Sequence, residues 1–187
     1  MALLGRRVLA RFGLFLLAAL ACPLLSAAPA QAVTREYQIK AVFLFNFSQF
    51  VDWPAATFAA PDSPLIIGIL GDDPFGAFLE ETIRGEKVGE HPLQIRRYQA
   101  SDQVDCHILF ISRSEAVRLE SELSALNGKS VLTVSDVEGA ARRGVVIRFI
   151  TESNRIRLRV NLDAAKRAGL TVSSKLLRSA EIVGDQP

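Results

Sequence analysis

The sequence predicts an α/β fold, a single three-layer domain with a central, mostly parallel sheet, a C-terminal antiparallel hairpin and flanking helices. Short apolar runs at Leu65–Leu70, Ile108–Ile111 and Ser130–Val134 are typical of strands that are covered on both faces. Helical patterns separate these runs, and strands that alternate with helices favour a parallel sheet. The pattern changes near the C-terminus, where a β-hairpin adds an antiparallel part.

The N-terminal segment has the organisation of a secretory signal peptide, which we place at residues 1–32. Three arginines precede an apolar core, and Ala30-Gln31-Ala32 is a small-x-small cleavage site. One alternative is a lipoprotein signal acylated at Cys22, which the following Pro23 fits poorly. Another is a retained signal anchor, for which the apolar core is short. We expect residues 33–187 to form one exported domain.

Charge and cysteine content exclude several function classes. Three of the 22 basic residues lie in the predicted signal peptide, so the exported part carries 19 basic and 20 acidic residues. This balance gives no sign of nucleic-acid binding. Cys106 becomes the only cysteine after export, so no internal disulfide can form, and its apolar neighbours predict that it is buried.

The segment Tyr37–Pro54 combines four phenylalanines, a tyrosine and the only tryptophan. The spacing predicts a helix over residues 37–51, which stops before Pro54. Its continuous apolar stripe consists of Ile39, Phe43, Phe47 and Phe50. A helix that is apolar on most sides covers one face of the sheet, and we expect the surplus around Phe45 and Val51 to contact a partner.

Helical patterns follow the first two buried strands. A helix over 75–83 comes first, and an amphipathic helix over 114–126, with Val117 among its apolar positions, ends at Asn127-Gly128. The other predicted elements are a more exposed strand over 93–98 and two C-terminal helices, 162–168 and 173–179.

The predicted hairpin joins residues 144–150 and 155–160 through a turn at 151–154. Alternation in its second strand places three arginines on one face, at Arg155, Arg157 and Arg159. Such a row can bind an anionic group or an acidic partner. The other interpretation is the solvated face of a hairpin.

A candidate ligand site follows the first buried strand, at the edge where open α/β sheets bind small molecules. Asp72 and Asp73 lie there, and paired carboxylates can hold a divalent cation. Alternatively, one of them caps the next helix, whose first turn suits Pro74. A small-ligand pocket would combine these aspartates with Trp53.

The sequence gives little indication of catalysis. Cys106 and His107 are neighbours on a strand, so their side chains point to opposite faces and cannot form a dyad. One exported cysteine and two histidines also lack the spacing of a metal site. We therefore predict no catalytic residue, no metal centre and no cofactor.

Several blocks resemble the YfiR family of periplasmic proteins. The similar blocks are Lys40-Ala41, Phe43–Phe47, Trp53-Pro54, Gly71–Gly76, Cys106–Ser112 and the run from Asn161 to Leu177. Their order and spacing cover nearly all of the exported chain.

The resemblance implies a location and a function. Members of this family are periplasmic, often homodimeric, and repress an inner-membrane diguanylate cyclase by binding its periplasmic sensor part. The chain would then be a negative regulator of cyclic di-GMP signalling and of biofilm growth, and not an enzyme. Some members carry disulfides, which the single exported cysteine rules out here. The alternative function is a periplasmic small-ligand-binding sensory protein.

Overall fold

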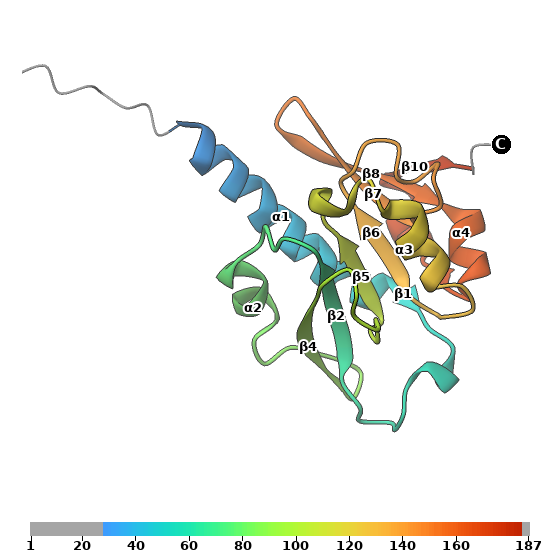
Figure 1. The fold of residues 1–187 in the computed structure, drawn as a ribbon. Helices are drawn as coiled ribbons and strands as arrows, with labels where there is room; N and C mark the ends of the chain where they lie inside the picture. Colours follow the sequence, from blue (N-terminus) through green and yellow to red (C-terminus); the bar gives the residue numbers. More distant parts are fainter. Residues whose placement is uncertain (1–27, 185–187) are drawn as a thin grey trace, which may run out of the picture.

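The computed structural model describes residues 28–184 and shows a sheet with helices on both faces (Figure 1). Within these residues the main sheet has eight strands, in the order β10-β8-β7-β6-β5-β2-β4-β3. The predicted signal peptide, with Cys22, lies outside the described residues except for 28–32, which belong to the first helix. A cleavage after Ala32 would therefore fall inside that helix.

Parallel pairing holds the centre of the sheet, as the sequence predicts. The central strands are β2 (Leu65–Leu70), β4 (His91–Tyr98), β5 (Ile108–Ile111), β6 (Leu132–Ser135) and β7 (Ile147–Glu152). β8 (Arg155–Asn161) pairs antiparallel with β7, which confirms the hairpin, and β10 (Ala180–Val183) lies parallel to β8. Two short antiparallel pairs were not predicted: β3 (Lys87–Val88) with β4, and β1 (Val51–Asp52) with β9 (Thr171–Val172).

Two apolar cores fill the space between the sheet and its helices. One core lies under α1 (Ala28–Phe50), α2 (Ala77–Ile83), α4 (Leu162–Arg167) and α5 (Ser174–Leu177). The other lies under α3 (Leu119–Ala125), which covers the opposite face of the sheet (Figure 1). The prediction of three layers is therefore confirmed.

The helix α1 buries a different stripe from the one predicted. Its buried positions are Tyr37, Lys40, Ala41, Leu44, Phe47 and Ser48. Ile39 is 41% exposed, so its place in the predicted apolar stripe is wrong, whereas Phe47 is buried and stacks on Phe149 with ring centroids 5.7 Å apart. The face was hard to predict because apolar side chains surround most of this helix, and the buried Lys40 on this side is paired with Asp136, which is distant in the sequence.

The helix predicted over 114–126 is shorter than expected. A 3-10 turn occupies Arg113–Glu115 and the α-helix begins only at Leu119. Val117 lies in the link between them and is 94% exposed, so its assignment to an apolar face is wrong. The reason is local: the buried Glu115 accepts hydrogen bonds from Arg118, and Ser112 caps the 3-10 turn.

Candidate functional site

A buried group of charges lies where the parallel strands β5 and β6 end. We call it the carboxyl-edge network, and its members are Glu36, Tyr37, Lys40, Arg113 and Asp136. Lys40 has no exposed surface, and its Nζ lies 2.5 Å from Asp136 Oδ2 and 2.5 Å from Glu36 Oε1. The Tyr37 hydroxyl donates to the same Asp136 oxygen at 2.7 Å. The network therefore connects the helix α1 to the loop after β6.

The carboxyl-edge network pairs its buried charges, although Asp136 Oδ1 makes no hydrogen bond within the described residues. Two carboxylates face the Lys40 ammonium, and the group also lies 4.3 Å from the centre of the Tyr37 ring, a cation–π distance. Burial and the hydrogen bond to Asp136 raise the pKa of Tyr37, so its hydroxyl stays protonated and donating. Arg113 Nε lies 3.3 Å from Asp136 Oδ1. The Arg113 side chain as a whole is largely exposed, so the network reaches the surface there.

Local sequence places Asp136 at this edge. Ser135 ends β6, and its hydroxyl donates to the Ile111 carbonyl at 2.8 Å and accepts from the Val137 amide at 3.1 Å. These bonds hold the backbone where β5 and β6 end side by side. The Asp136 carboxylate therefore points toward α1 and not toward solvent, and its side chain is only 1% exposed.

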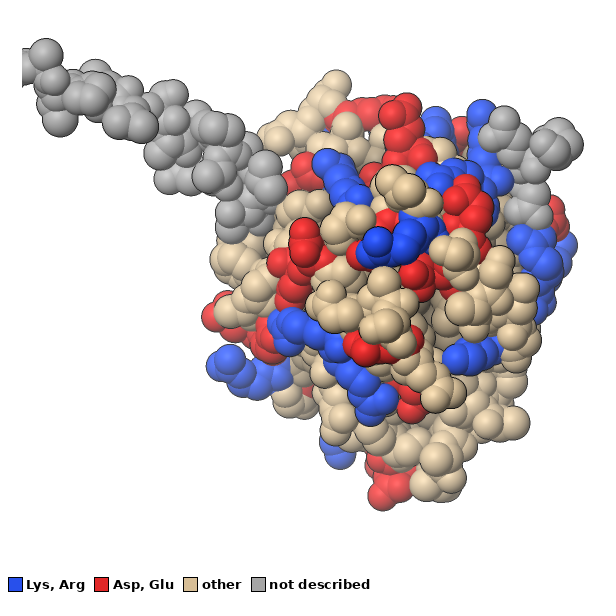
Figure 2. Space-filling view, in the orientation of Figure 1, with Lys and Arg blue, Asp and Glu red and all other residues tan. Residues whose placement is uncertain are grey.

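The hairpin presents a row of arginines on the side of the sheet that carries α3. We call it the arginine face: Arg148 of β7 and Arg155, Arg157 and Arg159 of β8. Leu158 and Val160 alternate with the β8 arginines and are buried on the other side. Acidic neighbours lie among the arginines. The pairs are Arg157 with Glu152, at 3.6 Å, and Arg159 with Glu181, at 2.7 Å. Figure 2 shows basic and acidic side chains mixed over this end of the molecule.

The predicted aspartates lie in a tight turn after β2. Asp73 Oδ1 accepts from the amides of Phe75 and Gly76, and its Oδ2 lies 2.7 Å from an Arg97 nitrogen. These contacts form a turn before α2. The capping interpretation is therefore wrong in detail, because the N-cap of α2 is Gly76, with no side-chain cap hydrogen bond, and Pro74 lies before the first helical turn. Asp72 is exposed, and its amide donates to Ser114 Oγ at 3.0 Å.

Trp53 lies at the other end of β2 from these aspartates. Its Nε1 donates to the His107 carbonyl at 3.1 Å, and His107 lies beside the first residues of β2. About six strand residues, roughly 20 Å at 3.3 Å per residue, separate the two places. Trp53 and the two aspartates, Asp72 and Asp73, therefore do not line one pocket.

The two partner residues predicted on the aromatic segment differ in accessibility. Phe45 is half-buried and packs against the main core. Val51 is 3% exposed because it belongs to β1, where it pairs with Val172. Its side chain is part of the core and gives a partner no accessible surface.

Cys106 is buried and free, as predicted. Burial raises the pKa of its thiol to about 12, so the thiol stays protonated at neutral pH. No group of three or more His, Cys, Asp or Glu in the described part of the chain could hold a metal ion.

Both histidines stack on one phenylalanine at the amino edge of the sheet. The Phe58 ring lies 3.9 Å from the His91 ring and 4.5 Å from the His107 ring, centroid to centroid. The Ile66 amide donates to His107 Nδ1 at 3.0 Å, which requires that nitrogen to be unprotonated. Burial lowers the pKa of His107.

This arrangement predicts a pH-dependent stability. The pKa of His107 is lower in the folded chain than its ordinary value of about 6.5, so the unfolded chain binds more protons below that pH. We expect the free energy of unfolding to fall as pH drops from 7.5 to 5. His107→Asn keeps an acceptor near the Nδ1 position and should show a weaker fall in urea titrations. Identical pH profiles of the two proteins would contradict this role of His107.

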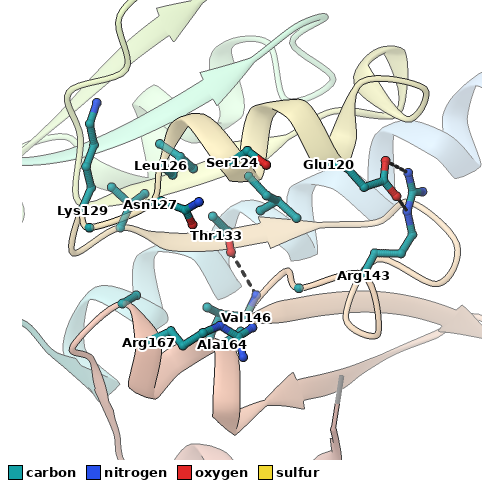
Figure 3. Close-up of a pocket in the computed structure, with 15 residues that line it drawn as sticks. Glu120, Ser124, Leu126, Asn127, Lys129, Thr133, Arg143, Val146, Ala164 and Arg167 are labelled. Carbon is teal, nitrogen blue, oxygen red and sulfur yellow. Dashed lines mark hydrogen bonds and ion pairs between the residues drawn. The ribbon is translucent and has the colours of Figure 1, made fainter. Parts of the chain in front are cut away.

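A surface groove of about 290 Å³ lies between α3 and α4 (Figure 3). Its lining is mixed, with apolar Leu123 and Val146 beside polar and charged groups. Arg143 closes one end through two bonds to Glu120, at 2.6 and 2.8 Å. Sequence reasoning missed this groove because its walls come from elements distant in the chain.

Sequence reasoning also missed the carboxyl-edge network. Lys40 and Asp136 are 96 positions apart, and neither belongs to a recognisable motif. Two signals were available: a single lysine inside an aromatic helix, and a Ser-Asp pair directly after a buried strand. Each is too common to predict a contact without the fold.

Comparisons with known proteins identify the family of the chain. None of the helices in residues 28–184 has the length and apolarity needed to cross a membrane. A search of curated protein sequences found no match. A family model described as YfiR/HmsC-like matches residues 37–181, from α1 to β10. The chain therefore belongs to the YfiR/HmsC-like family, which confirms the assignment predicted from its sequence blocks.

Proposed function

We propose that this protein is a periplasmic repressor that binds the periplasmic sensor part of an inner-membrane diguanylate cyclase and thereby lowers cyclic di-GMP. Membership of the YfiR/HmsC-like family supports a regulatory role in this signalling system. The observation that carries the proposal is the arginine face, whose Arg155 and Arg157 are exposed on the side of β8 opposite the buried Leu158 and Val160. We assign the chain a binding role and no catalytic one.

The arginine face has the properties of a docking surface for an acidic partner. Arg155 and Arg157 are exposed and stand on a rigid hairpin, which lowers the entropy cost of binding. Arginine is enriched at protein interfaces, and charge complementarity between two surfaces raises their association rate. The hairpin has a short connection. Ser153 and Asn154 both adopt positive φ, which is the geometry of a tight two-residue turn.

The aromatic helix contributes a second surface to the proposal. Ile39 and Val42 are 41% and 48% exposed on α1, and Phe45 is half-buried nearby on the same helix. We assign this surface to the homodimer that the family resemblance implies. Val51 takes no direct part in it because its side chain lies in the core.

The double variant Arg155→Glu/Arg157→Glu is the test of the partner surface. We expect it to fold normally, since both side chains are exposed, and to lose capture of the cyclase in co-purification from detergent-solubilised membranes. Cells carrying it should contain as much cyclic di-GMP as cells that lack the gene.

The control is Arg84→Glu, an exposed arginine after α2, at the other edge of the sheet. It should capture the cyclase as the unaltered protein does. If the double variant still captures the cyclase, the arginine face is not the docking surface. If the unaltered protein captures no membrane protein and its deletion leaves cyclic di-GMP unchanged, the repressor function itself is wrong.

A sensory protein for a small ligand is the second candidate function, and the groove between α3 and α4 favours it (Figure 3). Its volume of about 290 Å³ is near the lower end of ligand pockets. Thr133, Asn127 and Arg167 provide polar groups at its wall. Mass spectrometry of the denatured, purified protein distinguishes the two candidates, because only the sensory protein should retain a stoichiometric small molecule.

A further inference from the structure

Two arginines face each other directly across the hairpin. Arg148 of β7 is the register partner of Arg159 on β8, and both side chains lie on the arginine face. Side chains directly opposite in an antiparallel pair have Cβ atoms about 5 Å apart, and like charges there are destabilising. A pair of this kind needs an anionic group close to both arginines.

The acidic neighbours of the chain satisfy only one member of this pair. Arg159 Nε donates to Glu181 Oε2 at 2.7 Å. Arg148 Nε is buried and has no hydrogen-bond partner in the described part of the chain, and no ion pair joins Arg148 to a carboxylate there. Burial lowers the pKa of the Arg148 guanidinium, and the positive charge of Arg159 lowers it further. The carboxylates of Glu138 and Asp136 act in the opposite direction, and Arg113 has the smallest effect. The fold therefore holds one guanidinium in a place that disfavours its charge.

A third arginine completes the cluster. Arg113 follows β5, whose Ile111 is the register partner of Ser135 on β6, and Ser135 is in turn the register partner of Arg148. Arg113 therefore lies at the same end of the sheet, and its side chain is 63% exposed. Its contact with Asp136 is a single one at 3.3 Å, and the other Asp136 oxygen is taken by Lys40 and Tyr37. Arg113 is therefore free to offer its remaining donors to a group above the sheet.

We infer that Arg148, Arg159 and Arg113 form a binding site for an oxyanion, a carboxylate or a phosphoryl group. The planar forks of guanidinium groups match both anions in geometry and supply paired donors. An oxyanion bound there would accept from the guanidinium groups and offset the repulsion between Arg148 and Arg159. The site does not depend on the proposed cyclase, because its ligand is defined by the chemistry of the cluster alone.

The test is a titration followed through the arginine Hε–Nε signals in NMR spectra of the exported chain. Inorganic phosphate and acetate are the two probes, each added at constant ionic strength against sodium chloride. We expect a saturable shift of the Arg148 signal. This signal is assigned by its absence from the spectrum of Arg148→Lys. In Arg148→Lys the affinity measured on the Arg159 signal should fall about tenfold or more, because the paired donors are lost. In the control Arg155→Lys it should not change.

The responses to phosphate and to acetate show which class of oxyanion the site binds. Saturation by phosphate alone supports the site and assigns it to a phosphoryl-bearing ligand. Saturation by acetate, with or without phosphate, supports the site and assigns it to a carboxylate, from a free acid or from an acidic side chain. Shifts that follow ionic strength equally in chloride, or an equal loss of affinity in Arg155→Lys, would overturn the inference. None of these results depends on capture of a cyclase.

Discussion

Replacement of Asp136 by asparagine is expected to lower the free energy of unfolding by about 3–5 kcal/mol, the usual cost of removing one partner from a buried ion pair. Asparagine has almost the same shape, so the loss reports the charge. Without this carboxylate, the fully buried Lys40 keeps only Glu36 as a counter-charge, and Glu36 is partly exposed. Urea or guanidinium titration of residues 33–187 measures the change. A loss of this size is a large part of the stability of an ordinary domain, about 5–15 kcal/mol.

Two further variants separate the pair from other effects. Asp163→Asn removes an exposed carboxylate, 3.8 Å from Lys166, and should change the stability little. The double variant Lys40→Met/Asp136→Asn should cost less than the sum of its single changes, because neither charge is left alone. If Asp136→Asn costs no more than Asp163→Asn, the carboxyl-edge network is not a stabilising connection between α1 and the sheet.

Gly71→Ala is the second change from which we expect a large effect. Gly71 has φ +84°, a conformation that costs an alanine about 1–2 kcal/mol. A Cβ atom there would also lie 2.3 Å from Ser114 Oγ and 2.8 Å from Glu115 Oε1, so the loop after β5 must move. Overpacking of this kind adds about 1–3 kcal/mol. We expect a total loss of roughly 2–5 kcal/mol in the free energy of unfolding.

Gly85→Ala is a matched control for this substitution. Gly85 has a similar φ of +76°, but no atom would lie within 4 Å of its added Cβ. It should therefore show the backbone cost alone, about 1–2 kcal/mol. Equal losses for the two variants would mean that the loop after β5 accommodates a side chain at Gly71, and that the close approach of Ser114 does not restrict it.

Much of the fold could be predicted because its strands carry strong local patterns. The continuous apolar runs at Leu65–Leu70 and Ile108–Ile111 match β2 and β5 residue for residue, since strands buried on both faces need apolar side chains throughout. The hairpin was identified by the alternation of apolar and arginine residues along its second strand. This pattern arises because one face of the strand is buried and the other carries the arginines. The strand β10 escaped prediction because it is short and mostly exposed, with Glu181 and Ile182 at its centre.

The candidate sites could be predicted less well. The arginine row of β8 was visible because it depends on alternation within one strand. The position of Arg148 opposite Arg159 was not, since it depends on the register between two strands. The proposed pocket of Trp53 with Asp72 and Asp73 failed for a similar reason. Residues that flank one strand on either side were expected to meet, although the strand itself holds them apart.

The sequence by itself determined the α/β class, the mostly parallel sheet, the C-terminal hairpin and the membership of the YfiR/HmsC-like family, because each depends on local patterns or on blocks in fixed order. Only the tertiary structure decided which side of α1 is buried. Apolar residues surround most of that helix, so hydrophobicity alone did not select a face. On the buried side Tyr37, Ala41, Leu44 and Phe47 pack into the core, and Lys40 meets Asp136, which lies 96 positions away in the chain. A buried charge needs such a partner, and a partner this distant cannot be read from the sequence of the helix.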